Sequence, residues 1–190
     1  LGNDIGGSVR NPAFCCGISS LKPSAGRVPR ASTIAPVERG FADQWMAVDG
    51  PMARRVEDLS MAYEVLSGRE ILDPMTVDVP LYGPDFPRRA AIVKEVPGVE
   101  LPQSALEAID KAQSVLRSAG WEVQEILPPE LERVHEIWAH VLSANFKPLV
   151  DDPELFPRLM SKELLAMWDY IFERYDPNKK SILELFTERE

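Results

Sequence analysis

Two glycines precede a serine in the run Gly6-Gly7-Ser8, and this run is the best suited in the chain to chemistry. A serine hydroxyl attacks a carbonyl carbon once a base activates it. Glycine lets backbone N–H groups turn towards a substrate that comes close. The N–H groups of Ile5, Gly6, Gly7 and Ser8 can then face one oxygen, as acyl transfer requires. Taken alone, the same run more often marks an ordinary glycine-rich turn.

Other reactive side chains near this run support rival chemistries less well. Gly2 and Gly7 have the spacing of a phosphate-binding loop, but the lysine that such a loop places before its serine is absent. Lys22 could act as the base of a Ser-Lys pair. Cys15 and Cys16 are expected to pack as small buried residues, since no histidine lies nearby in sequence to activate them.

Metal and histidine chemistry is not predicted. The two histidines, His135 and His140, fall on one expected helix at about 140° from each other, so they do not converge on one metal. Glu132 and His135 have the Glu-x-x-His spacing of metal-binding bundles, but such sites need two copies. We expect helix-surface histidines, no metal and no organic cofactor.

The composition is that of a globular protein: 45% of the 190 residues are hydrophobic and 27% are charged. The net charge of −9 disfavours nucleic acid and anionic lipid as partners. No apolar run approaches the roughly 20 residues of a membrane span, and no signal peptide is evident. These features predict a cytoplasmic protein without a disulfide framework.

The first part of the chain, to about Gly50, is rich in Gly, Pro and Ser, which predicts tight turns and brief strands. A short helix is expected with Asn11 as N-cap, Pro12 as its first residue and Gly17 as its end. Apolar residues then recur at helical spacing up to Gly68, which predicts a second helix.

A strand, a helix and a strand are predicted next, after a proline-rich loop over residues 73–87. The strand Ala90–Val93, the helix Ala105–Ala119 and the strand Trp121–Ile126 form a parallel crossover unit, which favours an α/β architecture. Two further helices are expected at Leu131–Phe146 and Leu159–Tyr175. Their bounding prolines are Pro128, Pro129, Pro148, Pro157 and Pro177.

Beyond the serine run, a longer string extends to residue 28. It reads Asp-Ile-Gly-Gly-Ser-Val-Arg-Asn-Pro, then Cys-Gly, Lys-Pro and Gly-Arg-Val, with further matches through residues 43–59. This string closely resembles the second half of the amidase-signature motif. The resemblance covers the first third of the chain and implies the amidase-signature fold, a mixed twisted β-sheet covered by helices. Asn3 departs from the Thr or Ser that many members carry there.

The resemblance implies a role for each residue of the motif. Ser8 is the acyl-accepting nucleophile, and the N–H groups of Ile5, Gly6, Gly7 and Ser8 form the oxyanion hole. Asp4 and Arg10 are a supporting ion pair. A second serine on a cis peptide bond and a catalytic lysine are implied upstream of Leu1. The chain is expected to be cut at both ends, since it begins at Leu1 without an initiator Met and residues Ser181–Glu190 read as a helix still in progress.

The expected organisation is one partial amidase domain over residues 1–190. Residues 1–68 form the core with the nucleophile loop, residues 69–126 the loop and crossover unit, and residues 127–190 a helical cover of the substrate pocket. Core packing accounts for most aromatic residues of this last part, although some are candidates to line an acyl pocket.

The implied function is hydrolysis of a carboxylic amide, or of a related bond such as a carbamate, through an acyl-enzyme. The partner is a small-molecule amide, and a homodimer is compatible with the sequence. The alternative is the subunit of a tRNA-dependent glutamyl or aspartyl amidotransferase that releases ammonia from glutamine. The segment Ala31–Trp45 favours the free-standing amidase.

Overall fold

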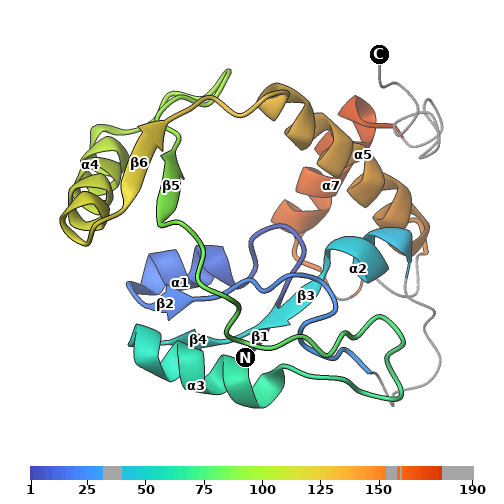
Figure 1. The fold of residues 1–190 in the computed structure, drawn as a ribbon. Helices are drawn as coiled ribbons and strands as arrows, with labels where there is room; N and C mark the ends of the chain where they lie inside the picture. The colour runs from blue at the N-terminus through green and yellow to red at the C-terminus, as the bar shows by residue number, and fades with distance from the viewer. Residues whose placement is uncertain (32–39, 153–157, 159, 177–190) are drawn as a thin grey trace. The chain divides into compact units, whose positions relative to one another are not determined.

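The computed structural model describes residues 1–31, 40–152, 158 and 160–176. Its chain divides into two compact units, Leu1–Gly83 and Pro84–Glu190. Helices and strands occur in both units (Figure 1), so the predicted α/β class is confirmed. Most of the segment Ala31–Trp45 that favoured a free-standing amidase lies outside the described residues.

The described strands of the first unit pair into two short antiparallel sheets. Strand β1 (Gly2–Asp4) pairs with β3 (Val48–Gly50), which places Asn3 opposite Asp49 and Asp4 opposite Val48. Strand β2 (Ser19–Ser20) pairs with β4 (Met52–Ala53). The turn that bears Ser8 therefore leaves a strand that is fixed by its register with β3.

Helix α1 (Arg10–Cys16) follows this turn directly. The predicted stop is confirmed, because Gly17 adopts the left-handed conformation and its N–H bonds to the carbonyls of Ala13 and Phe14. The predicted N-cap at Asn11 is wrong, since the helix begins at Arg10, two residues earlier than predicted, and Val9 is its N-cap. The Asp4 carboxylate accepts hydrogen bonds from the first N–H groups instead, so no cap from Asn11 is needed.

Two more helices follow in the described part of this unit. Helix α2 (Phe41–Met46) leads into β3, and helix α3 (Val56–Leu66) packs against β2 and β4 (Figure 1). The prediction of a helix ending before Gly68 is confirmed. The core of the unit consists of small and aliphatic side chains: Val9, Ala13, Val28, Ala42, Ala47, Val48 and Leu59.

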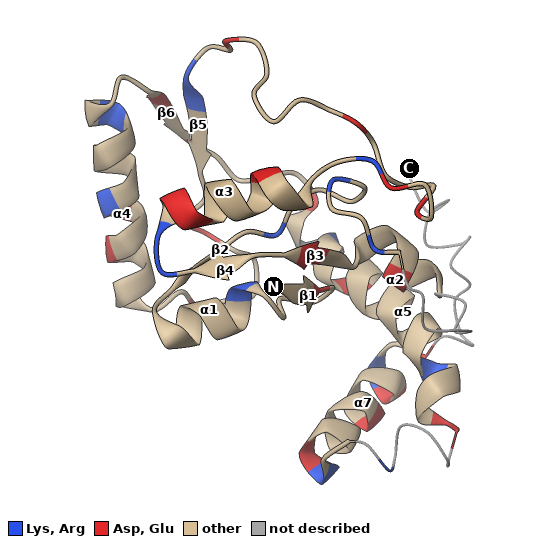
Figure 2. Cartoon of the chain, turned by 90° about the horizontal axis from the view of Figure 1, so that it is seen from below, with Lys and Arg blue, Asp and Glu red and all other residues tan. Residues whose placement is uncertain are grey.

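The second unit contains the predicted crossover. Strand β5 (Arg89–Ile92), helix α4 (Gln103–Ser118) and strand β6 (Glu122–Glu125) follow one another, and the two strands pair in parallel. Gly120 lies just beyond the end of α4 at a φ of 82°. Figure 2 shows charged residues of both signs along α4, as its amphipathic pattern requires. The predicted strand–helix–strand unit is therefore confirmed.

Two further helices pack together in the described part of this unit, α5 (Leu131–Val150) and α7 (Lys162–Arg174). The prediction that Pro148 bounds α5 is wrong. Proline removes a single N–H from the ladder, and the last turn continues with the bond from the Asp151 N–H to the Lys147 carbonyl. The Lys147 ammonium also pairs with the Asp151 carboxylate at 2.7 Å, which stabilises that turn.

Three expectations about side chains need correction. Cys15 and Cys16 are exposed in the structure, because α1 buries Ala13 against the unit and leaves both cysteines on its outer side. His140 is buried rather than on the helix surface, with its ring edge-on to Tyr175 at 5.2 Å. Its Nδ1 lies 3.0 Å from the Glu136 carbonyl oxygen, which satisfies it inside the helix pair.

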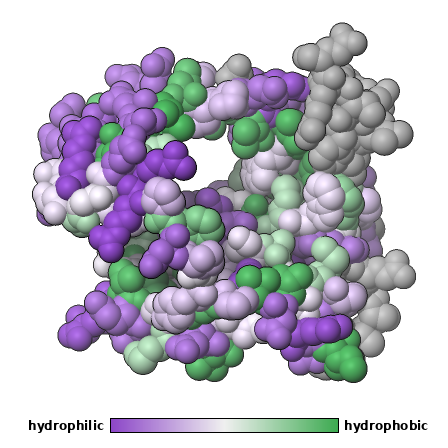
Figure 3. Space-filling view, in the orientation of Figure 1, coloured by the Kyte–Doolittle hydropathy of each residue, from purple (hydrophilic) through white to green (hydrophobic). Residues whose placement is uncertain are grey.

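Figure 3 shows hydrophobic residues interspersed among hydrophilic ones, with no regular pattern. Several large apolar side chains are exposed, among them Val65 and Ile71. None of the helices in the described ranges combines the length and hydropathy needed to traverse a bilayer.

Candidate active site

Asp4, the last residue of β1, is fully buried beneath the turn that bears Ser8. Its Oδ1 accepts from the Gly7 N–H at 2.8 Å, and its Oδ2 accepts from the Val9 N–H at 3.2 Å and the Arg10 N–H at 3.4 Å. One carboxylate thus satisfies three backbone donors of the turn and of the first turn of α1. The backbone path from residue 5 to residue 9 is tied to this side chain.

The Arg10 guanidinium completes the shell of Asp4. Its Nε donates to Oδ2 and its terminal nitrogen to Oδ1, both at 3.0 Å, in a two-pronged ion pair. Burial by itself raises the pKa of Asp4, but the bonds from Arg10 and from the three amides outweigh it and hold the pKa well below the usual range. The same pairing raises the pKa of Arg10. The structure thus pairs the two residues that the sequence assigned as a supporting ion pair.

The turn itself depends on Gly7. Its φ is 115°, a conformation that L side chains rarely adopt, and a Cβ there would lie 2.6 Å from Nδ2 of Asn11. The Gly7 carbonyl accepts from the Asn11 N–H at 2.7 Å, which joins the turn to α1. Asn11 therefore closes the turn from the helix side, a role that the sequence did not reveal.

Ser8 is exposed at the tip of this turn, immediately before α1. Its hydroxyl hydrogen-bonds to none of the residues in the described part of the chain. Lys22, a candidate base on sequence grounds, makes no hydrogen bond to it either. The Ser8 hydroxyl is therefore accessible on a fixed backbone. None of the described residues is hydrogen-bonded to it as an activating base.

The backbone donors near Ser8 differ in how they are occupied. The Gly7 N–H is held by the Asp4 carboxylate, whereas the Gly6 and Ser8 N–H groups donate to no protein acceptor within residues 1–31, 40–152 and 160–176. Gly6 is exposed and Ile5 is partly buried. The turn therefore offers at least two amides near the hydroxyl to an external oxygen atom.

The described residues form no cluster of three or more His, Cys, Asp or Glu side chains that could hold a metal ion. Two residues outside the expected set contact the residues of the site. The Asn11 side chain lies next to Gly7, and Asp49 lies opposite Asn3 in the strand pair. Only the pairing of β1 with β3 identifies Asp49, and no local pattern in the sequence signals it.

Comparisons with known proteins identify the family of this chain. The family model described as Amidase matches residues 1–187. An indoleacetamide hydrolase of Bradyrhizobium diazoefficiens is 35% identical over 144 residues, which is 75% of this chain and 28% of that protein. A glutamyl-tRNA(Gln) amidotransferase subunit of Thermus thermophilus is 39% identical over 142 residues, which is 69% of this chain and 28% of that protein.

Solved structures with the same fold include a 6-aminohexanoate cyclic dimer hydrolase and a bacterial aryl acylamidase of the amidase-signature family. The first has a TM-score of 0.69 at 21% identity and covers 97% of this chain and 40% of its own. The second has a TM-score of 0.65 at 24% identity and covers 97% of this chain and 39% of its own. The chain belongs to the amidase-signature family and has the corresponding part of its fold.

Proposed function

We propose that this chain carries the nucleophile of an enzyme that hydrolyses carboxylic amides through an acyl-enzyme. The observation that supports this most is the exposed Ser8 hydroxyl on a turn whose backbone is tied to the buried Asp4–Arg10 pair. Breaking an amide needs a nucleophile and donors at a fixed distance from each other, and such a turn provides both.

In the proposed reaction, Ser8 Oγ attacks the amide carbonyl carbon and its proton passes to a base. The second serine and the lysine that the family resemblance implies, upstream of Leu1, would relay that proton to the leaving nitrogen. The C–N bond breaks, the amine leaves, and water then releases the acid from the ester of Ser8. Among the described residues, Ser8 alone forms a covalent bond to the substrate in this scheme.

The Gly6 and Ser8 N–H groups are the proposed main donors to the oxyanion, and Ile5 remains in the set that the sequence predicts. The Gly7 N–H belongs to the same predicted set, but its bond to the Asp4 carboxylate makes it a weaker donor to a second anion. Its role is to hold the turn in shape. Asp4 and Arg10 act through the backbone and do not transfer protons in this scheme.

Replacement of Ser8 by alanine in the intact protein tests the proposal. Ser8→Ala removes the nucleophile and is expected to lower amide turnover by about three orders of magnitude or more. A fluorophosphonate probe should form a covalent bond to Ser8 of the unaltered protein, detected as a modified peptide by mass spectrometry. Ser104→Ala, an exposed serine near the start of α4, is the matched control.

Near-normal turnover of the Ser8→Ala protein would contradict the proposal. Absence of probe labelling on Ser8 would instead support a relative that binds amides without cleaving them.

The second candidate is an amidotransferase subunit that releases ammonia from glutamine. A glutamyl-tRNA(Gln) amidotransferase subunit among the relatives supports this candidate at 39% identity, which is comparable to the 35% identity of the indoleacetamide hydrolase. Both candidates use the same serine. Glutaminase activity that needs a co-purifying partner chain would select this candidate over a free-standing amidase.

A further inference from the structure

The outer face of strand β1 carries a second polar contact, separate from the Asp4–Arg10 pair. Asn3 and Asp49 are directly opposite residues of β1 and β3, and the Asn3 amide donates to Asp49 Oδ1 at 2.8 Å. Successive side chains of a strand point to opposite faces, so Asn3 points away from the side on which Asp4 is buried. The strand that precedes the nucleophile turn is therefore held on both faces.

Asp49 is itself held by Arg30. The same oxygen that receives Asn3 lies 3.4 Å from Arg30 Nε, in an ion contact without hydrogen-bond alignment. The Arg30 side chain is only 16% exposed. Its position is therefore set by the protein, and it fixes one side of the Asp49 carboxylate.

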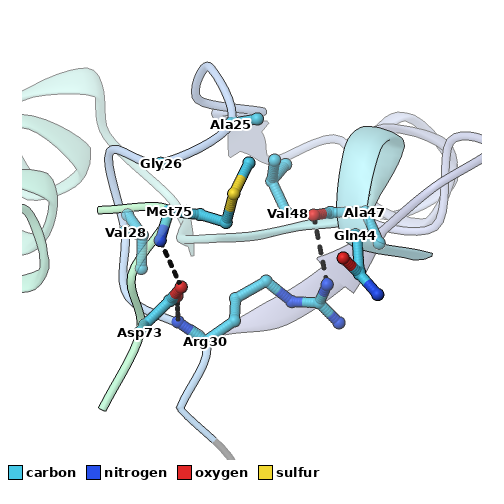
Figure 4. Close-up of a pocket in the computed structure, with 9 residues that line it drawn as sticks. All are labelled: Ala25, Gly26, Val28, Arg30, Gln44, Ala47, Val48, Asp73 and Met75. Atoms are coloured by element: carbon cyan, nitrogen blue, oxygen red, sulfur yellow. Dashed lines mark hydrogen bonds between the residues drawn. The ribbon is translucent and has the colours of Figure 1, made fainter. Parts of the chain in front are cut away.

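The rest of Arg30 is bonded to helix α2 and to the loop that follows α3. One terminal nitrogen donates to the carbonyl oxygens of Asp43 and Ala47 at 3.1 and 3.2 Å, and the other donates to the Asp43 carboxylate at 3.3 Å. The Arg30 N–H donates to Asp73 at 2.8 Å. Arg30 lines a cavity of about 40 Å³. Figure 4 shows its side chain extended towards Ala47, with Asp73 beside its backbone.

We propose that Asn3, Asp49 and Arg30 form a positioning relay that aligns strand β1, and through it the Ser8 turn, for attack on the substrate. The contact from Asn3 to Asp49 fixes β1 against β3, while Arg30 fixes Asp49 against α2. The proposal deepens the proposed function and rests on it. None of the three residues touches the substrate in this scheme.

Misalignment of β1 would reach Ser8 because the link between them is short. Asp4 is the next residue after Asn3, and its carboxylate holds the amides of Gly7 and Val9 on either side of Ser8. A displacement of β1 therefore moves the turn with it. Attack geometry is sensitive to displacements of about 1 Å, even when these originate away from the reacting atoms.

Removal of the contact from either side tests the relay. Asn3→Leu has nearly the same shape but no donor, and Asp49→Leu removes the acceptor and the partner of Arg30 as well. We expect the rate of covalent labelling of Ser8 by a fluorophosphonate to fall about fivefold to tenfold in Asn3→Leu and at least as much in Asp49→Leu. The double variant should be no slower than Asp49→Leu, because both changes break one contact.

Asp49→Asn separates the two halves of the relay. It keeps an oxygen for Asn3 and removes the charge that faces Arg30, so its labelling rate should lie between those of the unaltered protein and Asp49→Leu. The matched control is Gln103→Leu, which removes an amide-to-carboxylate bond of 3.3 Å to Glu107 on α4. The control should label at the unaltered rate.

All rates are measured on the intact protein under conditions where every variant is folded, so that a loss of stability alone leaves them unchanged. A rate for Asn3→Leu within twofold of the unaltered protein would overturn the relay. Effects of Asn3→Leu and Asp49→Leu that multiply in the double variant would overturn it too.

Hydrogen–deuterium exchange of residues 2–10 gives a second readout that needs no catalysis. Exchange there should be faster in Asn3→Leu, and it should be unchanged in Gln103→Leu. If the unaltered protein is not labelled at Ser8, the proposed function fails, and the exchange result still decides whether Asn3 and Asp49 hold the turn. Unchanged exchange in Asn3→Leu would exclude that role.

Discussion

The two units of the chain each bury a polar side chain completely, but the hydrogen bonding of these two side chains differs. Asp4 in the first unit and Ser143 in the second are among the largest fully buried side chains. Asp4 accepts hydrogen bonds from three backbone amides and from two nitrogens of Arg10. The hydroxyl of Ser143 on α5 has no hydrogen-bond partner among the described residues.

This difference reflects the interactions that define the local structure in each unit. In the first unit a buried charge specifies the backbone of a turn, because every donor around it must point at the same carboxylate. In the second unit helices pack through apolar and aromatic side chains, such as Trp168 between Phe146 and Phe172 at 4.8 and 5.5 Å. In the described part of that unit, the buried Ser143 hydroxyl does not define the geometry. Removal of the buried Asp4 carboxylate should therefore lower the free energy of unfolding, whereas removal of the buried Ser143 hydroxyl should not.

The largest effect is expected for Asp4→Ala. This change leaves the amides of Gly7 and Val9 without an acceptor and leaves Arg10 unpaired, although Arg10 is half exposed and regains water. We expect a loss of about 3 kcal/mol in the free energy of unfolding, measured by urea denaturation, and loss of Ser8 labelling.

The matched control is Asp110→Ala, because Asp110 pairs with Lys94 at 2.8 Å on the surface of the second unit and is 60% exposed. A surface ion pair contributes less than about 1 kcal/mol. Equal losses in the two variants would refute the special role of the buried carboxylate.

The contribution of Asp4 should also depend on pH. Its pKa in the folded protein lies below the value of about 3.9 of a free aspartate, so the unfolded chain takes up the proton first as pH falls. The stability difference between the unaltered protein and Asp4→Asn should be constant above about pH 5 and should shrink below it. A difference that grows on acidification would contradict the ion pair.

A smaller effect is expected for Gly7→Ala. The φ of 115° costs an L residue about 2 kcal/mol, and the new methyl group meets the Asn11 side chain. Gly120→Ala in the second unit is the control, because Gly120 has a φ of 82° with no atom within 4 Å of the position of a Cβ. Urea denaturation should show the larger loss for Gly7→Ala, and the variant Gly7→Ala with Asn11→Ala should recover part of it.

Local patterns predict the crossover of the second unit and the helix ends that are marked by glycine better than they predict contacts between distant residues. The crossover from β5 through α4 to β6 follows from strand, helix and strand patterns in order, since a parallel pair needs such a connection. The proline predicts an end of α5 before Pro148, but the Lys147–Asp151 pair carries the helix to Val150. Asp151 lies just after the last residue of α5, so the helical spacing of apolar residues does not reveal this pair.

The sequence predicts the motif of the candidate site, but it does not predict the contacts from distant residues that hold the motif in place. The glycine pair, Ser8, Asp4 and Arg10 are close in sequence, so their type and spacing predict the turn and the ion pair. Asn3 and Asp49 meet only because β1 and β3 pair in one register, 46 residues apart. The exposure of the two cysteines is unpredictable for a similar reason, since burial of α1 depends on what packs against it.

The smallest effect is expected for Ser143→Ala, and it should have the opposite sign to that of Asp4→Ala. A buried hydroxyl without a partner loses its bonds to water and gains none, and alanine is the better helix former at that position of α5. We expect urea denaturation to show no loss, or a gain of up to about 1 kcal/mol. A loss above about 1 kcal/mol would mean that Ser143 has a partner in solution, and the contrast between the two buried polar side chains would then disappear.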